Sequence, residues 1–314
     1  MNVINKESYE EIRTFIYCNA RPLELSLWKY FFENGKKEDV VKSLAFYQNK
    51  DGGFGNTLEA DSWNPNSSPY TTLYAINILK NIEFINPDHE IFKGIIRYLE
   101  NTEYCNEEGW FFTIPSNDNY PHAPWMTYSI EENKIQSIGL SAEIVSFILT
   151  YCNSESNLYK RAESVLEILI NKLNTTDELG EMVVGGYCVL LDTIKRMKLE
   201  KRFDYESILE RVKKLVYDSI ERDISKWQYY VASPSRYINS PNSIWYKDNE
   251  DILQKELDYL IETRPQNNVW NITWSWFDNN EKYPKEFAIS ENWWKSFKAI
   301  EKMILLRNFK RFEI

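Results

Sequence analysis

The feature that most constrains the fold is a glycine-rich turn between two helix-like segments. Residues 48–55 read Gln-Asn-Lys-Asp-Gly-Gly-Phe-Gly, so three of the chain's ten glycines fall within four positions. Apolar residues recur at helical spacing before the turn, over 37–48, and again after it, over 69–81. Glycine permits positive φ and close backbone approach, and Asp51 can satisfy backbone groups of the turn. The segment therefore predicts a helical hairpin, with Phe54 packed beneath the turn.

Helical patterns recur in pairs along the whole chain, with a period of about 40 to 50 residues that is typical of repeat folds. Six such hairpins predict an all-α fold in which an (α/α)6 toroid forms a single domain over residues 1–314. We find no alternating pattern that predicts a β-hairpin or a sheet. The predicted pairs are 6–18 with 22–34, 37–48 with 69–81, 88–101 with 137–152, 157–173 with 181–198, 205–222 with a less regular partner, and 249–263 with 291–307.

Four connections between the predicted helices are long and rich in Pro, Asn, Ser and aromatic residues. Long loops on one side of a scaffold usually carry function. In a toroid of alternating antiparallel helices, all four connections would emerge at one rim, around the mouth of the central cavity. We expect the functional site at that rim, within segments 51–68, 104–136, 223–248 and 264–290.

Composition excludes several classes of protein. The formal net charge of −10, without a basic stripe, argues against a nucleic-acid partner. No apolar run is long enough to predict a transmembrane helix, and the N-terminal segment lacks the apolar core of a signal peptide, so we expect a cytoplasmic protein. The four scattered cysteines and two histidines predict reduced thiols and no metal site. Aromatic residues make up 15% of the chain and either line a cavity or simply fill a helical core.

The first candidate site follows the glycine turn directly, where Glu59 and Asp61 precede Trp63. A carboxylic acid in a poorly solvated aromatic cavity has a raised pKa and can act as a general acid toward an alkene or a leaving group. The structural alternative is that one of these carboxylates caps a turn or pairs with a cation such as Arg21. Arg21 could instead meet a diphosphate or a carboxylate of a ligand.

Two further candidates lie in the later loops. Prolines on both sides of His122 fix the backbone, so that this imidazole and Trp125 are presented in a defined orientation. A single histidine without spaced partners can equally be structural. In the C-terminal region, Trp274 and Trp276 would lie on one face of an extended segment, where indoles can stabilise cationic intermediates or stack on flat ligands, including sugars.

The glycine turn resembles the Gln-x-x-Asp-Gly-Gly-Phe-Gly repeat of protein prenyltransferase β subunits and the related repeat of triterpene cyclases. Segments 68–72 and 185–188 resemble further inner-helix starts of that superfamily, whose fold is an α/α toroid. The whole chain most resembles single-toroid bacterial proteins of unassigned activity. The shared elements are Tyr-Gln-Asn at 47–49, Asp-Gly-Gly-Phe-Gly at 51–55, Leu-Glu at 58–59, Tyr-Pro-His-Ala-Pro-Trp at 120–125 and a Trp-rich C-terminus.

Several motifs of these families are absent from the chain. The Asp-x-Asp-Asp motif of alkene-protonating cyclases has only a partial counterpart in Glu59 and Asp61, and the Asp-Asp-x-x-Asp motif that binds metal diphosphates is missing. Cys188 lacks the Asp and His partners that hold zinc in prenyltransferases. We therefore expect no cofactor and no resident metal, with Mg²⁺ entering only if the substrate is a diphosphate.

The resulting hypothesis is a protein that acts on an isoprenoid or other apolar substrate by acid-initiated carbocation chemistry. Glu59 or Asp61 would be the acid, and His122 would adjust protonation. The aromatic cavity would be shaped by Trp125, Tyr187, Trp274 and Trp276. Two alternatives stay open at this point, namely a carbohydrate-active enzyme on an (α/α)6 barrel and a non-catalytic binding or scaffold toroid.

Overall fold

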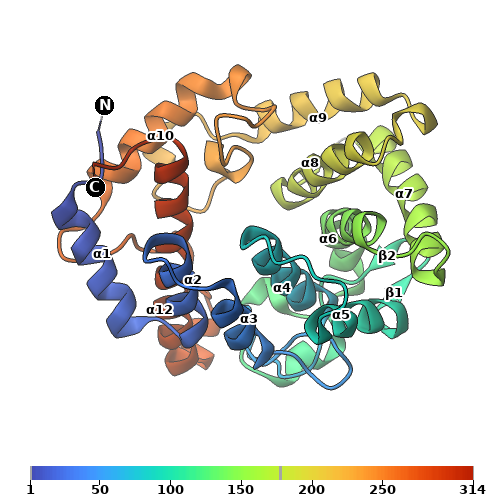
Figure 1. Cartoon of the computed structure of the whole chain (residues 1–314), viewed down its shortest axis with the longest axis horizontal. Helices are drawn as coiled ribbons and strands as arrows, with labels where there is room; N and C mark the ends of the chain where they lie inside the picture. The colour runs from blue at the N-terminus through green and yellow to red at the C-terminus, as the bar shows by residue number, and fades with distance from the viewer. Residues whose placement is uncertain (1, 177–178, 314) are drawn as a thin grey trace. The chain divides into compact units, whose positions relative to one another are not determined.

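The computed structural model describes residues 2–176 and 179–313, and these residues form an almost wholly helical structure (Figure 1). The predicted all-α class is confirmed. The α-helices are α1 (Lys6–Asn19), α2 (Pro22–Phe32), α3 (Lys37–Ala45), α4 (Pro69–Asn81), α5 (Glu90–Asn101), α6 (Ile130–Tyr151), α7 (Asn157–Thr175), α8 (Glu181–Arg196), α9 (Tyr205–Ser219), α10 (Glu250–Thr263), α11 (Asn279–Lys282) and α12 (Pro284–Asn308).

Most predicted helix limits agree with the structure, and the clearest differences are two early starts. Helix α6 begins at Ile130 rather than at 137, because Ser129 caps it by accepting a hydrogen bond from the amide of Glu132. The missed residues 130–136 are mostly polar, and their two isoleucines, Ile130 and Ile135, are exposed, so they do not continue the apolar face. Helix α12 begins at Pro284 rather than at 291, with proline in the first turn where its missing N–H costs nothing.

The prediction that the chain forms no β-hairpin is wrong in one place. Strand β1 (Cys105–Asn106) pairs antiparallel with β2 (Gly109–Trp110). The Asn106 side chain accepts a hydrogen bond from the amide of Glu108 and so closes the turn. Strands of two residues are too short to show an alternating pattern in the sequence.

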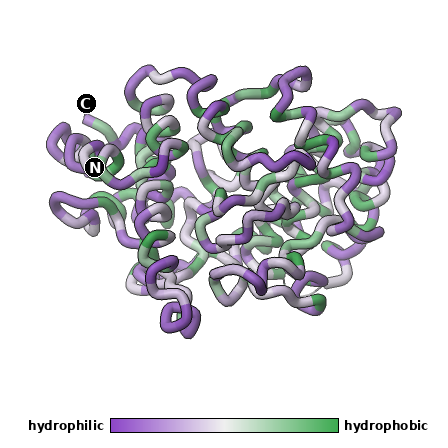
Figure 2. The backbone as a smooth tube through the Cα atoms, turned by 90° about the horizontal axis from the view of Figure 1, so that it is seen from below, coloured by the Kyte–Doolittle hydropathy of each residue, from purple (hydrophilic) through white to green (hydrophobic). Residues whose placement is uncertain are grey.

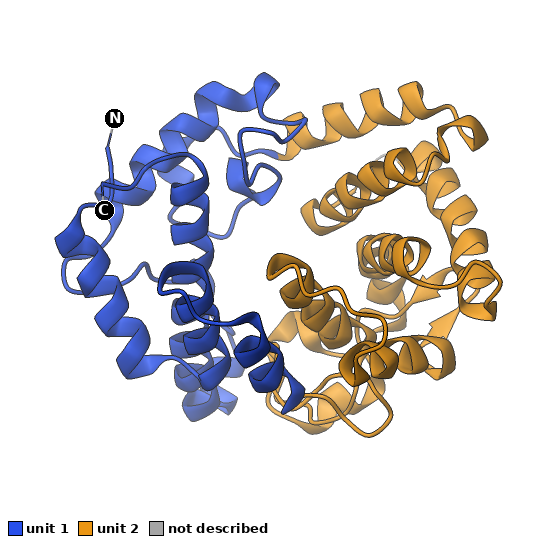
Figure 3. Cartoon of the chain, viewed as in Figure 1, with its two compact units in different colours: residues 1–46, 220–314 blue, residues 47–219 orange. Residues whose placement is uncertain are grey.

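The chain divides into two compact units, drawn in different colours in Figure 3. Unit 1 consists of residues 1–46 and 220–314, and unit 2 consists of residues 47–219. The residues that follow α9 belong to unit 1 and form short 3₁₀ turns at Ile224–Lys226, Pro234–Arg236 and Lys247–Asn249 instead of a long inner helix. The segment 220–249, expected to supply a less regular partner for the fifth hairpin, thus contains short 3₁₀ turns and no α-helix.

Unit 2 is a two-layer arrangement of helices. Helix α6 packs between α4 and α8, while α7 packs against α5 and α9 in the second layer (Figure 1). The approach of α6 to α8 is unusually close, because a Cβ on Gly186 would lie 2.4 Å from the carbonyl oxygen of Gly139. Consecutive helices thus alternate between the layers, which is the arrangement that a helical-hairpin repeat predicts for this part of the chain.

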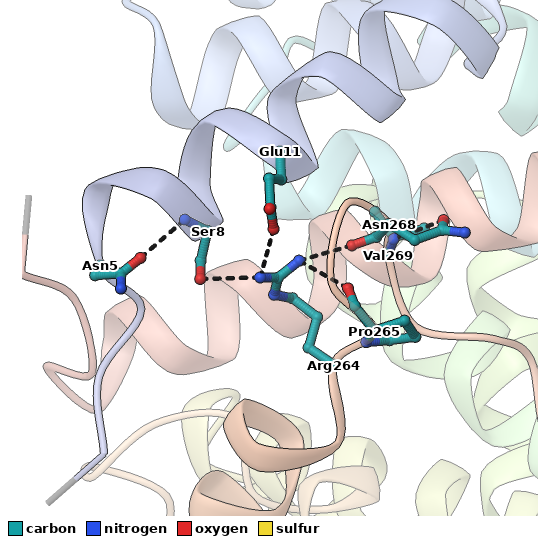
Figure 4. A network of polar contacts seen from close by, with 7 residues as sticks. All are labelled: Asn5, Ser8, Glu11, Arg264, Pro265, Asn268 and Val269. Carbon is teal, nitrogen blue, oxygen red and sulfur yellow. Dashed lines mark hydrogen bonds and ion pairs between the residues drawn. The ribbon is translucent and has the colours of Figure 1, made fainter.

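Unit 1 joins the two ends of the chain. Helix α1 packs against α2 and α12, and α2 also packs against α3. Figure 4 shows how the loop after α10 is attached to α1: the Arg264 guanidinium donates to Ser8 Oγ at 2.9 Å and to Glu11 Oε2 at 2.7 Å. The same guanidinium donates to the carbonyl oxygens of Pro265 and Asn268 and so holds its own loop in shape.

Apolar residues alternate with polar ones along the helices, as Figure 2 shows. The apolar positions face the core at helical spacing, for example Ile91, Ile95 and Leu99 of α5, each at most 2% exposed. Among the described residues, no helix has both the length and the apolar character required to cross a bilayer.

Candidate functional site

The glycine turn lies against helix α5 of the next hairpin. Gly52 adopts a φ of 98°, and a Cβ at this position would lie 2.1 Å from the carbonyl oxygen of Gly94. The Gln48 side chain donates to the carbonyl oxygens of Gly52 and Ile91, at 2.9 and 3.0 Å. Asp51 accepts from the amide of Gly53 and therefore serves the turn itself. The turn attaches one hairpin to the next and directs the following segment, 58–64, into the interior of unit 2.

The structure brings two of the candidate segments together, although they lie about 60 residues apart in the sequence. Ser62 and His122 form an antiparallel bridge. On one side of it the amide of Trp63 donates to the carbonyl oxygen of Pro121 at 2.9 Å, and on the other the amide of Ala123 donates to the carbonyl oxygen of Asp61 at 2.8 Å. We call residues 59–64 together with 120–125 the paired ribbon.

The hydrogen-bond pattern of the paired ribbon determines how the Ser62 and His122 side chains are placed across the bridge. Ser62 and His122 are a non-hydrogen-bonded pair, the type in which opposite side chains come closest. Asp61 lies in a turn, which the Ser62 amide closes by donating to the carbonyl oxygen of Glu59 at 3.2 Å. The turn and the bridge bring the backbones of Asp61 and His122 close together.

Both carboxylates of the paired ribbon are buried. Glu59 is 2% exposed and Asp61 is 4% exposed. The Glu59 side chain accepts a hydrogen bond at 3.0 Å from the amide of Asp61 and thereby closes its own turn. The structural alternative raised for these two residues, that one of them caps a turn, thus describes one contact of Glu59.

The imidazole of His122 is held within its own loop. Nδ1 lies 2.6 Å from the carbonyl oxygen of Tyr120, and because a carbonyl only accepts, Nδ1 carries a proton. Nε2 lies 3.1 Å from Thr127 Oγ1. A neutral ring accepts from this hydroxyl, and a charged ring donates to it. These contacts fix the loop that carries Trp125, whose side chain is 38% exposed.

Sequence reasoning missed two buried asparagines that hold the paired ribbon in place. Asn64 donates to Asn117 Oδ1 and to Ser116 Oγ, each at 2.8 Å. Asn117 in turn donates to the carbonyl oxygen of Met126 at 2.9 Å. The only sequence signal was the high asparagine content of these loops, which is common in loops without such a role.

The structure places Tyr187 in the packing of unit 2. Its side chain is 1% exposed, and its hydroxyl donates to the carbonyl oxygen of Leu169 on α7 at 2.8 Å. Burial raises the pKa of the Tyr187 hydroxyl. Tyr187 therefore joins α8 to α7, and a role in shaping a cavity stays a prediction.

The remaining predicted residues belong to unit 1. Arg21 Nε lies 3.1 and 3.0 Å from the two carboxylate oxygens of Glu24, and its guanidinium stands over the Trp293 ring at 4.8 Å. Sequence reasoning missed Glu24 as a partner, although the spacing of three residues, from the N-cap position Arg21 into the first turn of α2, could have indicated it.

The two C-terminal tryptophans have different surroundings within unit 1. Trp276 is fully buried against Phe287, with ring centroids 5.7 Å apart. Trp274 makes an edge contact with Trp294 at 5.4 Å. Both indoles pack against other aromatic rings, and their role as ligand-binding residues stays a prediction.

Within residues 2–176 and 179–313, no group of three or more His, Cys, Asp or Glu side chains is arranged to hold a metal ion. Comparison of the chain with protein-family models, with curated proteins and with solved structures finds no match. The resemblance to the terpenoid cyclase and prenyltransferase superfamily therefore stays a prediction drawn from the motifs of the sequence.

Proposed function

We propose that the chain is a terpenoid cyclase-like protein whose helical hairpins close into an (α/α)6 toroid, and that it protonates an isoprenoid or similar apolar substrate. One observation carries the proposal: the paired ribbon holds two carboxylates, Glu59 and Asp61, almost fully buried and two residues apart. The alternating helical layers of unit 2 and the attachment of the glycine turn to α5 support the toroid.

In this proposal Asp61 is the proton donor. Burial disfavours the charged form of a carboxyl group in general, and an acid that stays protonated at neutral pH can donate to an alkene. The alkene's π electrons form the new C–H bond, the positive charge moves to the neighbouring carbon, and the carboxylate is left behind. Loss of another proton to that carboxylate gives an isomerised alkene and restores the acid, so the step needs no redox partner.

The other residues of the paired ribbon have supporting roles in the proposal. Glu59 holds the turn that presents Asp61, because its carboxylate accepts from the Asp61 amide. The indoles of Trp63 and Trp125 would stabilise the carbocation through their π faces. His122 positions the Trp125 loop through Tyr120 and Thr127. A diphosphate substrate would bring Mg²⁺ with it, whereas a hydrocarbon or alcohol would not.

The test is proton incorporation from solvent. The purified protein is incubated in D₂O with prenyl alcohols, prenyl diphosphates with Mg²⁺, and squalene, and the recovered lipid is analysed by mass spectrometry. We expect deuterium in at least one lipid with the wild-type protein, and a decrease of about 100-fold or more in D61N, the size of effect typical for loss of a general acid. The matched control is E131Q, because Glu131 is a carboxylate with a side chain 79% exposed on α6.

The alternatives predict different results in a parallel ligand screen. Thermal shifts are measured with the same lipids and with oligosaccharides, since a ligand of the folded state raises the melting temperature. Stabilisation by oligosaccharides alone would replace the proposal with a carbohydrate-active protein. If D61N and E59Q both incorporate as much deuterium as the wild-type protein, neither carboxyl group is the acid. If neither lipids nor oligosaccharides shift the melting temperature, the result favours a scaffold protein.

A further inference from the structure

A second site of distinctive chemistry lies in unit 1, on helix α12. The ammonium group of Lys302 stands over the ring of Trp270, with Nζ 5.2 Å from the ring centroid. Trp270 is 4% exposed and is held in place by its own N–H, which donates to the carbonyl oxygen of Leu260 at 2.7 Å. The aromatic surface beneath Lys302 is therefore fixed.

The two carboxylates near Lys302 have other hydrogen-bond or ion-pair partners. Glu256 on α10 accepts from Ser235 twice, from the hydroxyl at 2.6 Å and from the amide at 2.7 Å. Glu301 on α12 pairs with Lys298 at 2.8 Å. Among the residues that the structure describes, Lys302 Nζ has neither an ion pair nor a hydrogen bond, and it contacts the face of Trp270.

The surroundings of Lys302 disfavour the positively charged form of its side chain. The pKa of Lys302 is lowered to about 8, first by burial and also by the positive charge of Lys298, while Glu256 and Glu301 act in the opposite direction. The indole face also favours the charged form. Lys302 as a whole is half-buried.

We propose that Lys302 is a covalent attachment site for a small aldehyde, which it binds as an imine with Trp270 as one wall of the site. The neutral amine attacks the carbonyl carbon, a C–N bond forms, and the π electrons of the carbonyl move to its oxygen. A proton passes from nitrogen to that oxygen through water. A second proton from water reaches the hydroxyl group, which leaves as water while the nitrogen lone pair forms the C=N bond. The nitrogen then returns its remaining proton to water, so each imine releases one water molecule.

Lys298 provides a matched comparison on the same helix. It also stands over an indole, that of Trp294, with Nζ 5.6 Å from the ring centroid. Unlike Lys302, it has a carboxylate partner, Glu301. The two lysines therefore share the helix and the aromatic contact and differ in the ion pair.

The experiment uses the wild-type protein, acetaldehyde as the probe and cyanoborohydride to trap the imine by reduction. Peptide mass spectrometry gives the rate of modification at each lysine from pH 6.5 to 10. We expect Lys302 to react at least about tenfold faster than Lys298 at pH 7.5, and its rate to level off above about pH 8. Equal rates at the two lysines, or a Lys302 rate that continues to rise through pH 10, would overturn the proposal.

Two variants then identify the lysine that carries the adduct. K302R keeps the positive charge and removes the nucleophile, so the fast-reacting site should disappear while the far-ultraviolet circular dichroism is retained. K298R should leave the fast site in place. If K302R fails to fold, the rate ratio and pH profile of the wild-type protein still decide the matter. The outcome is independent of the proton-transfer assay, because the two sites lie in different units.

Discussion

Gly52 and Gly94 meet backbone to backbone, so closely that a Cβ on Gly52 would lie 2.1 Å from the carbonyl oxygen of Gly94. This contact explains why the turn is rich in glycine: it must lie flat against helix α5 of the next hairpin. Gln48 strengthens the attachment, since its side chain donates to Gly52 and to Ile91 on α5. The turn thus links successive repeats and orients the paired ribbon that follows it.

We predict that G52A destabilises the protein by about 2–5 kcal/mol, because the methyl group meets backbone and because alanine is strained at a positive φ. G94A should cost about 1–3 kcal/mol, since its methyl group meets the end of the Gln48 side chain, which can move only by giving up its hydrogen bonds. Urea denaturation followed by circular dichroism measures both.

Gly185 supplies the control for these variants. It lies inside helix α8, and apart from its chain neighbours and the backbone of its own helix no atom of the described residues lies within 4 Å of the position that a Cβ would take. G185A should therefore stabilise the protein by about 0.5–1 kcal/mol. A G52A protein as stable as the wild type would show that the turn is not held against α5.

We predict that His122 and Thr127 are energetically coupled through the Nε2–Oγ1 contact of 3.1 Å. T127V removes the hydroxyl at nearly constant volume and should cost about 0.5–1.5 kcal/mol, while H122A, which also frees the Tyr120 carbonyl, should cost about 1–3 kcal/mol. A double-mutant cycle by urea denaturation should give a coupling of about 0.5–1.5 kcal/mol. Additive effects would instead indicate that His122 does not hold this loop.

We predict a pH-dependent contribution of Lys302 to stability. Its pKa is lowered to about 8 in the folded protein, below the ordinary value of 10.5, so between these pH values the unfolded chain binds more protons than the folded one. Stability from this group therefore rises with pH across the window, and the cost of burying the charge is fully present below pH 8. Relative to K302M, the wild-type protein should gain about 1–2 kcal/mol between pH 7.5 and 9.5.

The measurement for Lys302 compares urea denaturation of wild type and K302M at the two pH values. K298M corrects for the removal of one positive charge from α12, because Lys298 lies one helical turn away. A difference between wild type and K302M that stays constant from pH 7.5 to 9.5, after this correction, would contradict the lowered pKa.

Local sequence signals determined most of the secondary structure. Apolar periodicity predicted α1, α4 and α10 to within one or two residues, because each has a continuous apolar face that is visible within a few turns. The same reasoning missed the first turns of α6 and α12, where a capping serine begins one helix and a proline begins the other.

The sequence also indicated Glu59, Asp61 and His122 as candidates, but as two unrelated segments. Only the tertiary structure decided that Ser62 pairs with His122, that Asn64 and Asn117 hold the ribbon, and that Lys302 stands over Trp270. The physical reason is the separation of the interacting residues in the sequence. Helical periodicity and caps depend on neighbours within one or two turns, whereas these contacts join residues about 30 to 60 positions apart. Such pairs form because buried backbone groups and side chains must find partners in the folded core, and many segments of this chain could have supplied them.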